Sequence, residues 1–180
     1  MQLKSVIVAS LLAGAASALP AAHGISARAL CTPKDNTGFT VRINSTDELN
    51  GKILGISGDT VGVDLPSTDS VIWPYTNGKS LKMPGPGYKY LLSGYLIPTS
   101  DNAGGEQLMF SEAVPAVPVG LGVFTTSCDL QGFFYLAVEY SWQWQVCPVV
   151  VGGEGWTVHR GATREGCRDV RLRMSYGPPY

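Results

Sequence analysis

The densest apolar stretch beyond the N-terminal region covers residues 133–147 and alternates between two kinds of side chain. Its even positions are apolar or aromatic: Phe134, Leu136, Val138, Tyr140, Trp142, Trp144 and Val146. Its odd positions from Glu139 to Gln145 are polar. Because successive side chains of a strand point to opposite faces, this period of two predicts a half-buried strand. The stretch is long for one strand, so we expect a break near residues 139–141 and two paired strands facing one core.

The rest of the chain shows the same pattern in shorter pieces. Alternating or apolar runs occur at 39–43, 53–65, 88–97, 108–110, 123–125, 155–159 and 170–174. The run at 53–65 contains a turn cluster at 57–59, which predicts two short strands joined by a tight turn. No apolar stripe follows a helical period. With 22 glycines and 12 prolines as punctuation, the chain predicts a single all-β domain of short antiparallel strands. A sandwich, a barrel and a β-trefoil-like arrangement all fit.

The N-terminal residues predict secretion. Residues 1–18 combine Lys4, a short apolar run and small residues at Ala16 and Ala18, the pattern of a secretory signal peptide. Residues 19–30 are small and featureless, and we interpret them as a flexible lead-in or a short propeptide. Residues 31–180 would form the all-β domain. We therefore expect an extracellular protein with no membrane association after signal cleavage.

Four cysteines lie beyond the predicted cleavage site: Cys31, Cys128, Cys147 and Cys167. An even number in a secreted chain favours two disulfides, for which three connectivities exist. We prefer Cys147 with Cys167, which closes the shorter loop, and Cys31 with Cys128, which would tie down the mature N-terminus. The other two connectivities remain open.

Charge is low overall but uneven. The net charge is −1 with 15% charged residues, which gives no electrostatic footprint for nucleic acid. Five arginines gather near the C-terminus: Arg160, Arg164, Arg168, Arg171 and Arg173. They fit either a solvated strand face balanced by Glu165 and Asp169, or a docking face for an anionic wall polymer that involves Arg171 and Arg173.

Two further patterns concern carbohydrate. Asn44, Ser45 and Thr46 form an N-glycosylation acceptor directly after the strand predicted at 39–43. The aromatic residues also offer a sugar-stacking platform, for which the candidates are Trp142, Trp144 and Trp156, with Trp73 or Tyr75 beside them. The competing interpretation is that these rings simply fill the core.

Catalytic and metal-binding patterns are poor. His159 could pair with Asp169 and a serine, but no nucleophile elbow accompanies it. Glu139 is the best-placed acid for a two-carboxylate glycosidase, although an exposed strand glutamate explains it more simply. No metal-ligand spacing occurs in the sequence. We expect no enzyme activity, no cofactor and no metal.

The C-terminal half also resembles a known family. The segments that carry the resemblance are 132–136, Trp144 to Pro148 with its Cys-Pro end, Gly155 to Val158, and Gly166-Cys167 followed by Val170 and Leu172. They are similar to the PhiA-like group of small secreted fungal cell-wall proteins. The resemblance implies a non-enzymatic protein of the hyphal or conidial wall, linked to wall integrity and to the development of spore-bearing cells. It also implies a structural disulfide between Cys147 and Cys167.

We therefore expect a secreted structural protein of the fungal wall or cell surface, with wall polysaccharide or wall glycoproteins as partners. A secreted effector or elicitor that acts on a host is the alternative. A polysaccharide-binding module is a further alternative, and a polysaccharide-active enzyme ranks last.

Overall fold

The fold is all-β, as the alternating pattern predicts. The computed structural model describes residues 32, 34, 36–66, 70–72, 74–77, 79–85, 89–99, 104–113, 123–149 and 153–177. Within these ranges every regular element is a strand and every strand pairing is antiparallel. The predicted signal peptide, the lead-in, Cys31 and Trp73 lie outside the described residues.

Thirteen strands are described, and together they form one strongly bent sheet. Their bounds are β1 Phe39–Asn44, β2 Gly55–Ser57, β3 Thr60–Val63, β4 Ser70–Val71, β5 Tyr75–Asn77, β6 Ser80–Pro84, β7 Leu91–Pro98, β8 Glu106–Ser111, β9 Phe124–Cys128, β10 Phe134–Val138, β11 Trp144–Pro148, β12 Trp156–Arg160 and β13 Arg168–Tyr176. The hairpin predicted at 53–65 is confirmed, because β2 and β3 pair around a turn at Gly58 and Asp59.

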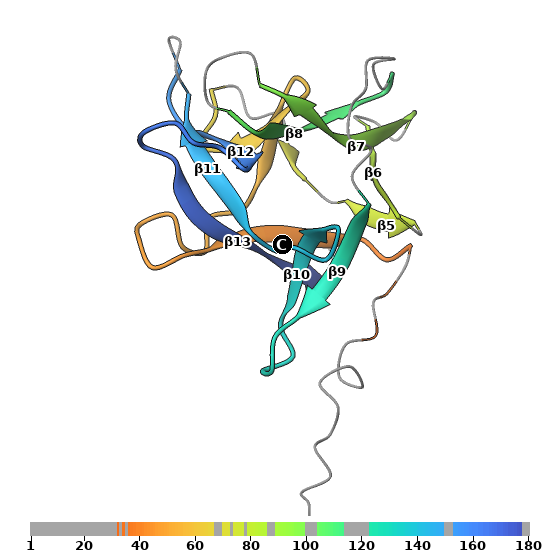
Figure 1. The fold of residues 1–180 in the computed structure, drawn as a ribbon. Helices are drawn as coiled ribbons and strands as arrows, with labels where there is room; N and C mark the ends of the chain where they lie inside the picture. Colours follow the sequence, from red (N-terminus) through yellow and green to blue (C-terminus); the bar gives the residue numbers. More distant parts are fainter. Residues whose placement is uncertain are drawn as a thin grey trace, which may run out of the picture.

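The sheet curls into a nearly closed barrel, one of the three arrangements that the sequence allows (Figure 1). Its main path runs β5-β6-β7-β8-β3-β12-β11-β13-β10-β9, and β1 pairs with β13. Backbone hydrogen bonds from Phe39 N to Pro74 O (2.9 Å) and from Asn36 N to Thr76 O (2.8 Å) join the start of β1 to the β5 region. These bonds join the β5 end of the path to β1, and a bond from Phe124 N to Lys79 O (3.1 Å) joins β9, at the other end, to the residue before β6.

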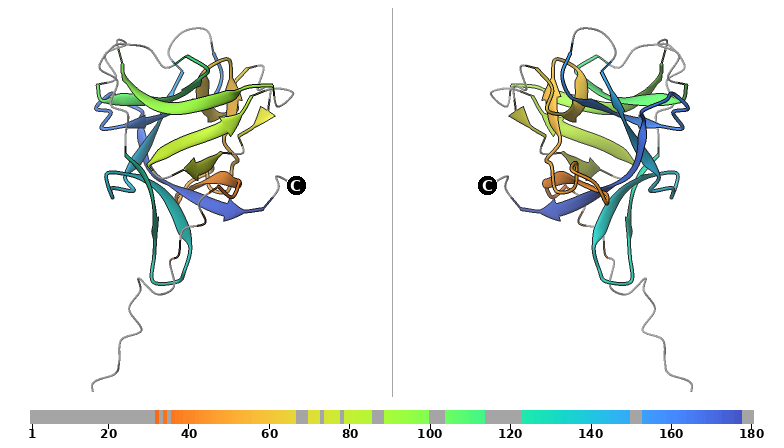
Figure 2. Two further views of the ribbon diagram at one scale, coloured as in Figure 1. Left: turned by 90° about the vertical axis from the view of Figure 1, so that its right-hand side faces the viewer. Right: turned by 90° about the vertical axis from the view of Figure 1, so that its left-hand side faces the viewer.

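Strand β13 holds the two parts of the barrel together. Its first residues pair with β11, and its later residues pair with β1 on one edge and with β10 on the other. The hairpin of β9 and β10 extends away from the barrel body in Figure 2. Leu130, in the turn of this hairpin, is 85% exposed. The outer face of β13 is therefore flanked by β1 and by this projecting hairpin.

The inside of the barrel is one hydrophobic cluster to which almost every strand contributes. Trp144 is the largest fully buried side chain, and Phe39, Phe110 and Phe124 are buried around it in the same cluster. Burial of apolar surface on this scale is the main stabilising contribution to a small β fold. The aromatic residues of this chain therefore divide into core residues and surface residues, and this division decides which of them can meet a ligand.

The break predicted in the 133–147 stretch is confirmed. Glu139 and Tyr140 form a tight turn, closed by mutual 2.9 Å backbone hydrogen bonds between Val138 and Ser141. The expected pairing of the two strands with each other is wrong. Beyond that one bridge, β10 and β11 lie one after the other along β13, because the turn and the two residues that follow it loop out between them.

The disulfide predicted between Cys147 and Cys167 is present. It joins the buried end of β11 to the segment just before β13, across a sequence separation of 20 residues. Cys128 is also disulfide-bonded. Its predicted partner, Cys31, lies outside the described residues.

Candidate functional site

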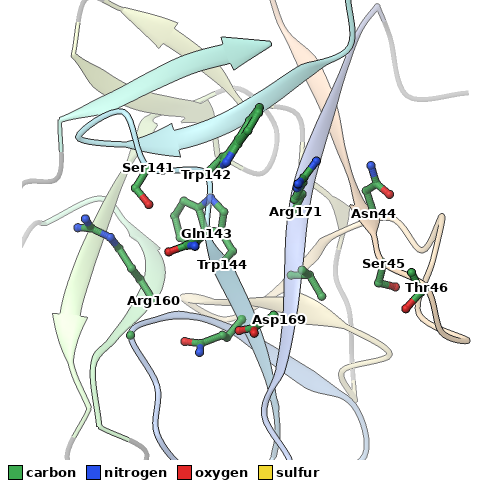
Figure 3. Close-up of a pocket in the computed structure, with 13 residues that line it drawn as sticks. Asn44, Ser45, Thr46, Ser141, Trp142, Gln143, Trp144, Arg160, Asp169 and Arg171 are labelled. Atoms are coloured by element: carbon green, nitrogen blue, oxygen red, sulfur yellow. The ribbon is translucent and has the colours of Figure 1, made fainter. Parts of the chain in front are cut away.

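Two shallow grooves meet on the outer surface beside β13. The larger, about 730 Å³, is called here the Trp142 groove. Its polar and aromatic lining includes Asn44, Trp142, Gln143, Gln145, Asp169 and Arg171 (Figure 3). The smaller, about 610 Å³, lies toward the β9–β10 hairpin and is called the Asp129 groove. Asn44, Trp142 and Arg171 line both grooves, so these three side chains form the centre of the candidate site.

The position of Trp142 follows from the tight turn before it. Glu139 and Tyr140 both adopt positive φ angles, 50° and 67°. Positive φ at two successive central residues is typical of the two-residue turns that reverse a strand. For residues other than glycine it costs roughly 1–2 kcal/mol each. The turn places Trp142 in the loop between β10 and β11, where its side chain is half-buried at the surface.

Trp142 is fixed by two neighbours. Its ring system and the Tyr135 ring form a T-shaped pair, with centroids 5.6 Å apart and planes at 83°. The Arg171 guanidinium lies 4.8 Å from the ring centroid. Figure 3 shows Arg171 between Trp142 and Asn44. Cation–π contacts of this kind hold an arginine in place without neutralising its charge.

A chain of hydrogen bonds connects Asn44 to Asp129 through Tyr135. The Asn44 amide donates to the Tyr135 hydroxyl (3.0 Å), which donates to an Asp129 carboxylate oxygen (2.9 Å). Desolvation acts to raise the pKa of Asp129, but hydrogen bonds from the Phe133 N–H, the Tyr135 hydroxyl and the Gln131 N–H lower it. Desolvation, and then the bond to Asp129, raise the pKa of Tyr135. The phenol therefore stays protonated as a donor, and Asn44 is held in a defined orientation.

The arginines predicted to dock an anionic polymer lie against aromatic rings. Arg173 lies 3.6 Å from the Phe133 ring centroid, as Arg171 lies against Trp142. The two hypotheses that the sequence kept apart, an arginine face and an aromatic platform, thus meet in one surface.

The other two tryptophans of the predicted platform differ from Trp142: Trp144 borders the Trp142 groove with a buried side chain, and Trp156 lies outside both grooves. Trp144 is 1% exposed and donates its indole N–H to the Leu136 carbonyl (2.8 Å). The prediction of Trp144 as a stacking residue is wrong, because the turn leaves Trp142 outside and points Trp144 into the core. Trp156 lines neither groove. It is half-buried against the core, and the Arg168 guanidinium lies 4.5 Å from its ring.

The candidate catalytic residues do not converge. His159 is 1% exposed, and its Nε2 lies 2.7 Å from the Thr157 hydroxyl. Glu139 lies in the exposed turn rather than in a strand, and it pairs with Arg160 (3.4 Å). Tyr75, proposed beside the platform, is in β5 and lines neither groove. Among the described residues there is no cluster of three His, Cys, Asp or Glu side chains that could hold a metal ion.

The predicted glycosylation site lies in the same surface. Asn44 is the last residue of β1, and its side chain already lines both grooves. Thr46, the hydroxyl residue of the acceptor sequence, is exposed. A glycan on Asn44 would therefore begin at the centre of the candidate site.

When the protein is produced through a eukaryotic secretory pathway, we expect it to lose mass on enzymatic deglycosylation, and the Thr46→Ala variant to show no such step. This substitution removes the acceptor sequence but leaves the hydrogen bond from Asn44 to Tyr135 intact. The Asn44→Gln variant should also show no loss of mass on deglycosylation. Its melting temperature, compared with that of Thr46→Ala, reports how much the hydrogen bond from Asn44 to Tyr135 contributes to stability. A mass step that survives in both variants would contradict glycosylation at Asn44. Mass spectrometry of the intact protein makes the measurement.

Comparisons with known proteins give no relative: no family model, no curated protein and no solved structure matches this chain. In the part of the chain that the structure describes, no helix is long and apolar enough to cross a membrane.

Proposed function

We propose that this protein is a secreted, non-enzymatic protein of the fungal cell wall that binds wall polysaccharide in the Trp142 groove. The observation that carries the proposal is the composition of that groove. A half-buried tryptophan stands beside amide, carboxylate and guanidinium side chains in one open surface. Sugars need this combination, because their rings have apolar C–H faces and their edges carry hydroxyls that donate and accept hydrogen bonds.

The arrangement suits binding better than catalysis. Glycoside hydrolysis generally requires two carboxyl groups that flank the bond to be cleaved. Among the described residues that line the Trp142 groove, Asp169 is the single carboxylate, and none is a histidine. The polar residues are instead those that orient a ligand: Asn44, Gln143 and Arg171.

The wall assignment is supported by the signal-peptide pattern and by the resemblance to PhiA-like wall proteins. The disulfide between Cys147 and Cys167 suits an oxidising, extracellular setting. Membership of the PhiA-like group stays a prediction.

Trp142→Ala should weaken retention on the wall polymer that binds the protein by roughly tenfold, as removal of a central aromatic contact commonly does. The measurement is a pull-down of the secreted protein on washed hyphal walls and on insoluble chitin, β-glucan and mannan. Tyr140→Ala is the matched control, because Tyr140 is 82% exposed in the preceding turn and lines neither groove. Equal melting temperatures for the two variants would show that the fold is unchanged.

Two results of this test would contradict the proposal. The first is a wild-type protein that is retained on none of these materials. The second is a Trp142→Ala variant that binds as well as the Tyr140→Ala control. Fractionation of the producing culture tests the location separately. Protein held in washed walls and released by glucanase or reductant supports a wall role, whereas protein found only in culture fluid or infected host tissue supports the effector alternative.

A further inference from the structure

Three arginines share the outer face of β1 and β13. In β13 the outward residues Asp169, Arg171 and Arg173 alternate with buried Val170 and Leu172. On the neighbouring strand Arg42 lies directly opposite Arg173, and Asn44 lies opposite Arg171. Directly opposite side chains in an antiparallel pair have Cβ atoms about 5 Å apart. Arg42 is therefore a third member of a cationic face that the C-terminal arginine cluster alone does not reveal.

This arrangement is unfavourable without a partner. Like charges directly opposite in a sheet destabilise the pairing. Elsewhere the molecule neutralises its arginines: Arg160 pairs with Glu106 and Glu139, and Arg168 pairs with Asp47 and Glu48. These partners are not the Glu165 and Asp169 expected from the sequence. For Arg42, Arg171 and Arg173, by contrast, the described structure contains no ion pair.

The contacts of these arginines hold the positive charges in place instead. Arg171 lies against Trp142, Arg173 lies against Phe133, and Arg42 donates to the Gly51 carbonyl (3.0 Å). Aromatic rings and a backbone carbonyl orient a guanidinium, but they do not supply the full negative charge that a carboxylate would.

The nearest acidic groups do not remove this excess of positive charge. Asp129 is close enough to Arg171 for their charges to interact, but its two oxygens already accept three hydrogen bonds. Asp169 lies two residues from Arg171 along β13 and lines the Trp142 groove but not the Asp129 groove, and in the described structure it forms no ion pair with Arg171. The face therefore keeps two oriented guanidinium groups that form no ion pair in the described structure, beside an aromatic ring, with a third on the next strand.

We propose that this face, defined by Arg42, Arg171 and Arg173, binds the carboxylate groups of an acidic polysaccharide whose rings lie against Trp142. This inference rests on the proposed function, because it names the ligand class of the same site. A guanidinium matches a carboxylate through two parallel N–H···O bonds, and a polyuronate presents one carboxylate on each sugar ring. A nucleic acid fits less well, because such a partner requires a more extensive basic surface than a chain of net charge −1 provides.

The test compares two soluble polymers with the same sugar backbone: polygalacturonate, and its methyl ester, in which the carboxylates are esterified and carry no charge. We expect the protein, carrying Thr46→Ala to remove any glycan from the site, to bind polygalacturonate about tenfold more tightly than the ester at low salt. Raising the salt to about 0.5 M should abolish this preference, since exposed charges are then screened.

The variant that carries both Arg171→Gln and Arg173→Gln should bind polygalacturonate no better than the ester, and Arg42→Gln should lose part of the preference. The matched control carries Lys79→Gln and Lys89→Gln, which remove two exposed positive charges from positions that line neither groove. The control should keep the full preference, which separates a site effect from the change in net charge. Melting temperatures no lower than that of the parent protein confirm that all variants fold.

Other outcomes would overturn all or part of this inference. Equal affinity for the acid and the ester, or a preference that survives loss of both arginines, overturns the acidic-ligand inference but leaves wall binding through Trp142 standing. Failure to bind either polymer, together with failure to bind washed walls, overturns the proposed function as well. Tighter binding of polyphosphate at equal charge concentration, unaffected by Trp142→Ala, would assign the face to a phosphate polymer and overturn the carbohydrate ligand.

Discussion

Replacing Trp144 with alanine should lower the free energy of unfolding by about 3–5 kcal/mol, the usual cost of removing a large buried aromatic side chain. Trp144 is the largest fully buried side chain, and Leu136 accepts the hydrogen bond of its indole N–H. The substitution leaves a cavity in the middle of the core and takes away this donor. Urea denaturation of the purified variant, followed by tryptophan fluorescence or circular dichroism, measures the loss.

Two further variants sharpen this result. Trp144→Phe keeps most of the buried volume but lacks the N–H, so its loss should be smaller, about 1–3 kcal/mol. Trp142→Ala removes a ring that is only half-buried, and it should cost clearly less than Trp144→Ala. A Trp144→Ala protein as stable as Trp142→Ala would contradict the assignment of Trp144 to the core and Trp142 to the surface.

Removing the disulfide with Cys147→Ala and Cys167→Ala should cost about 3 kcal/mol, the amount expected for a crosslink that closes a loop of this size. The bond ties the end of β11 to the segment that leads into β13. Without this bond, the unfolded chain has more conformational entropy, and the segment before β13 is no longer covalently linked to β11. The unfolding midpoint in urea, measured for the double variant and for the oxidised wild type, gives the difference.

The control for this experiment is the wild type in the presence of a thiol reductant. Cys147 is fully buried, so the folded protein should resist reduction until it is partly unfolded. Adding reductant during unfolding should then bring the wild-type transition close to that of the double variant, apart from any contribution of the Cys128 disulfide. A double variant that unfolds at the wild-type midpoint would show that the crosslink adds nothing to stability.

The elements of the fold could be predicted because strand signals are local. Alternation along 170–174 anticipated the inward Val170, Leu172 and Met174 of β13. The turn residues at Gly58 and Asp59 placed the β2–β3 hairpin, since such turns fix the pairing of their neighbours. The length of the 133–147 stretch predicted a break, which lies at Glu139 and Tyr140. In each case the information lies within a short window of about fifteen residues or fewer, in which a side-chain period can be read.

The sequence indicated Asn44, Trp142 and Arg171 separately, but it could not predict that they meet, because this depends on register between distant strands. Asn44 lies opposite Arg171, and Arg42 opposite Arg173, only because β1 pairs with β13. Nothing in either segment specifies that pairing. The alternation of aromatic residues also gave a wrong prediction, because it placed Trp142 and Trp144 on one face of a strand. The tight turn and the loop after it break the alternation between the two residues, and this separates a surface ring from a core ring.

Asn44 shows a third limit of the sequence. Its acceptor motif marked it as a place for a glycan, but no local pattern indicates that its amide also contacts Tyr135. The hydrogen bond from Tyr135 to Asp129 follows from the turn of the β9–β10 hairpin, where Asp129 also accepts the backbone N–H groups of Gln131 and Phe133. Through these contacts Asn44, predicted as a glycosylation site, is also held in the lining of both grooves.

The central position of β13 has a consequence for the order in which the molecule can assemble. The strand that completes both parts of the barrel comes last among the described strands, and its partner β1 comes first among them. Pairing between segments so far apart closes a long loop. The chain loses conformational entropy on this closure before the new contacts stabilise it, so the step is slow. A chain that has not yet delivered β13 lacks the strand that unites the sheet. Such a chain therefore cannot close the barrel until β13 has been made.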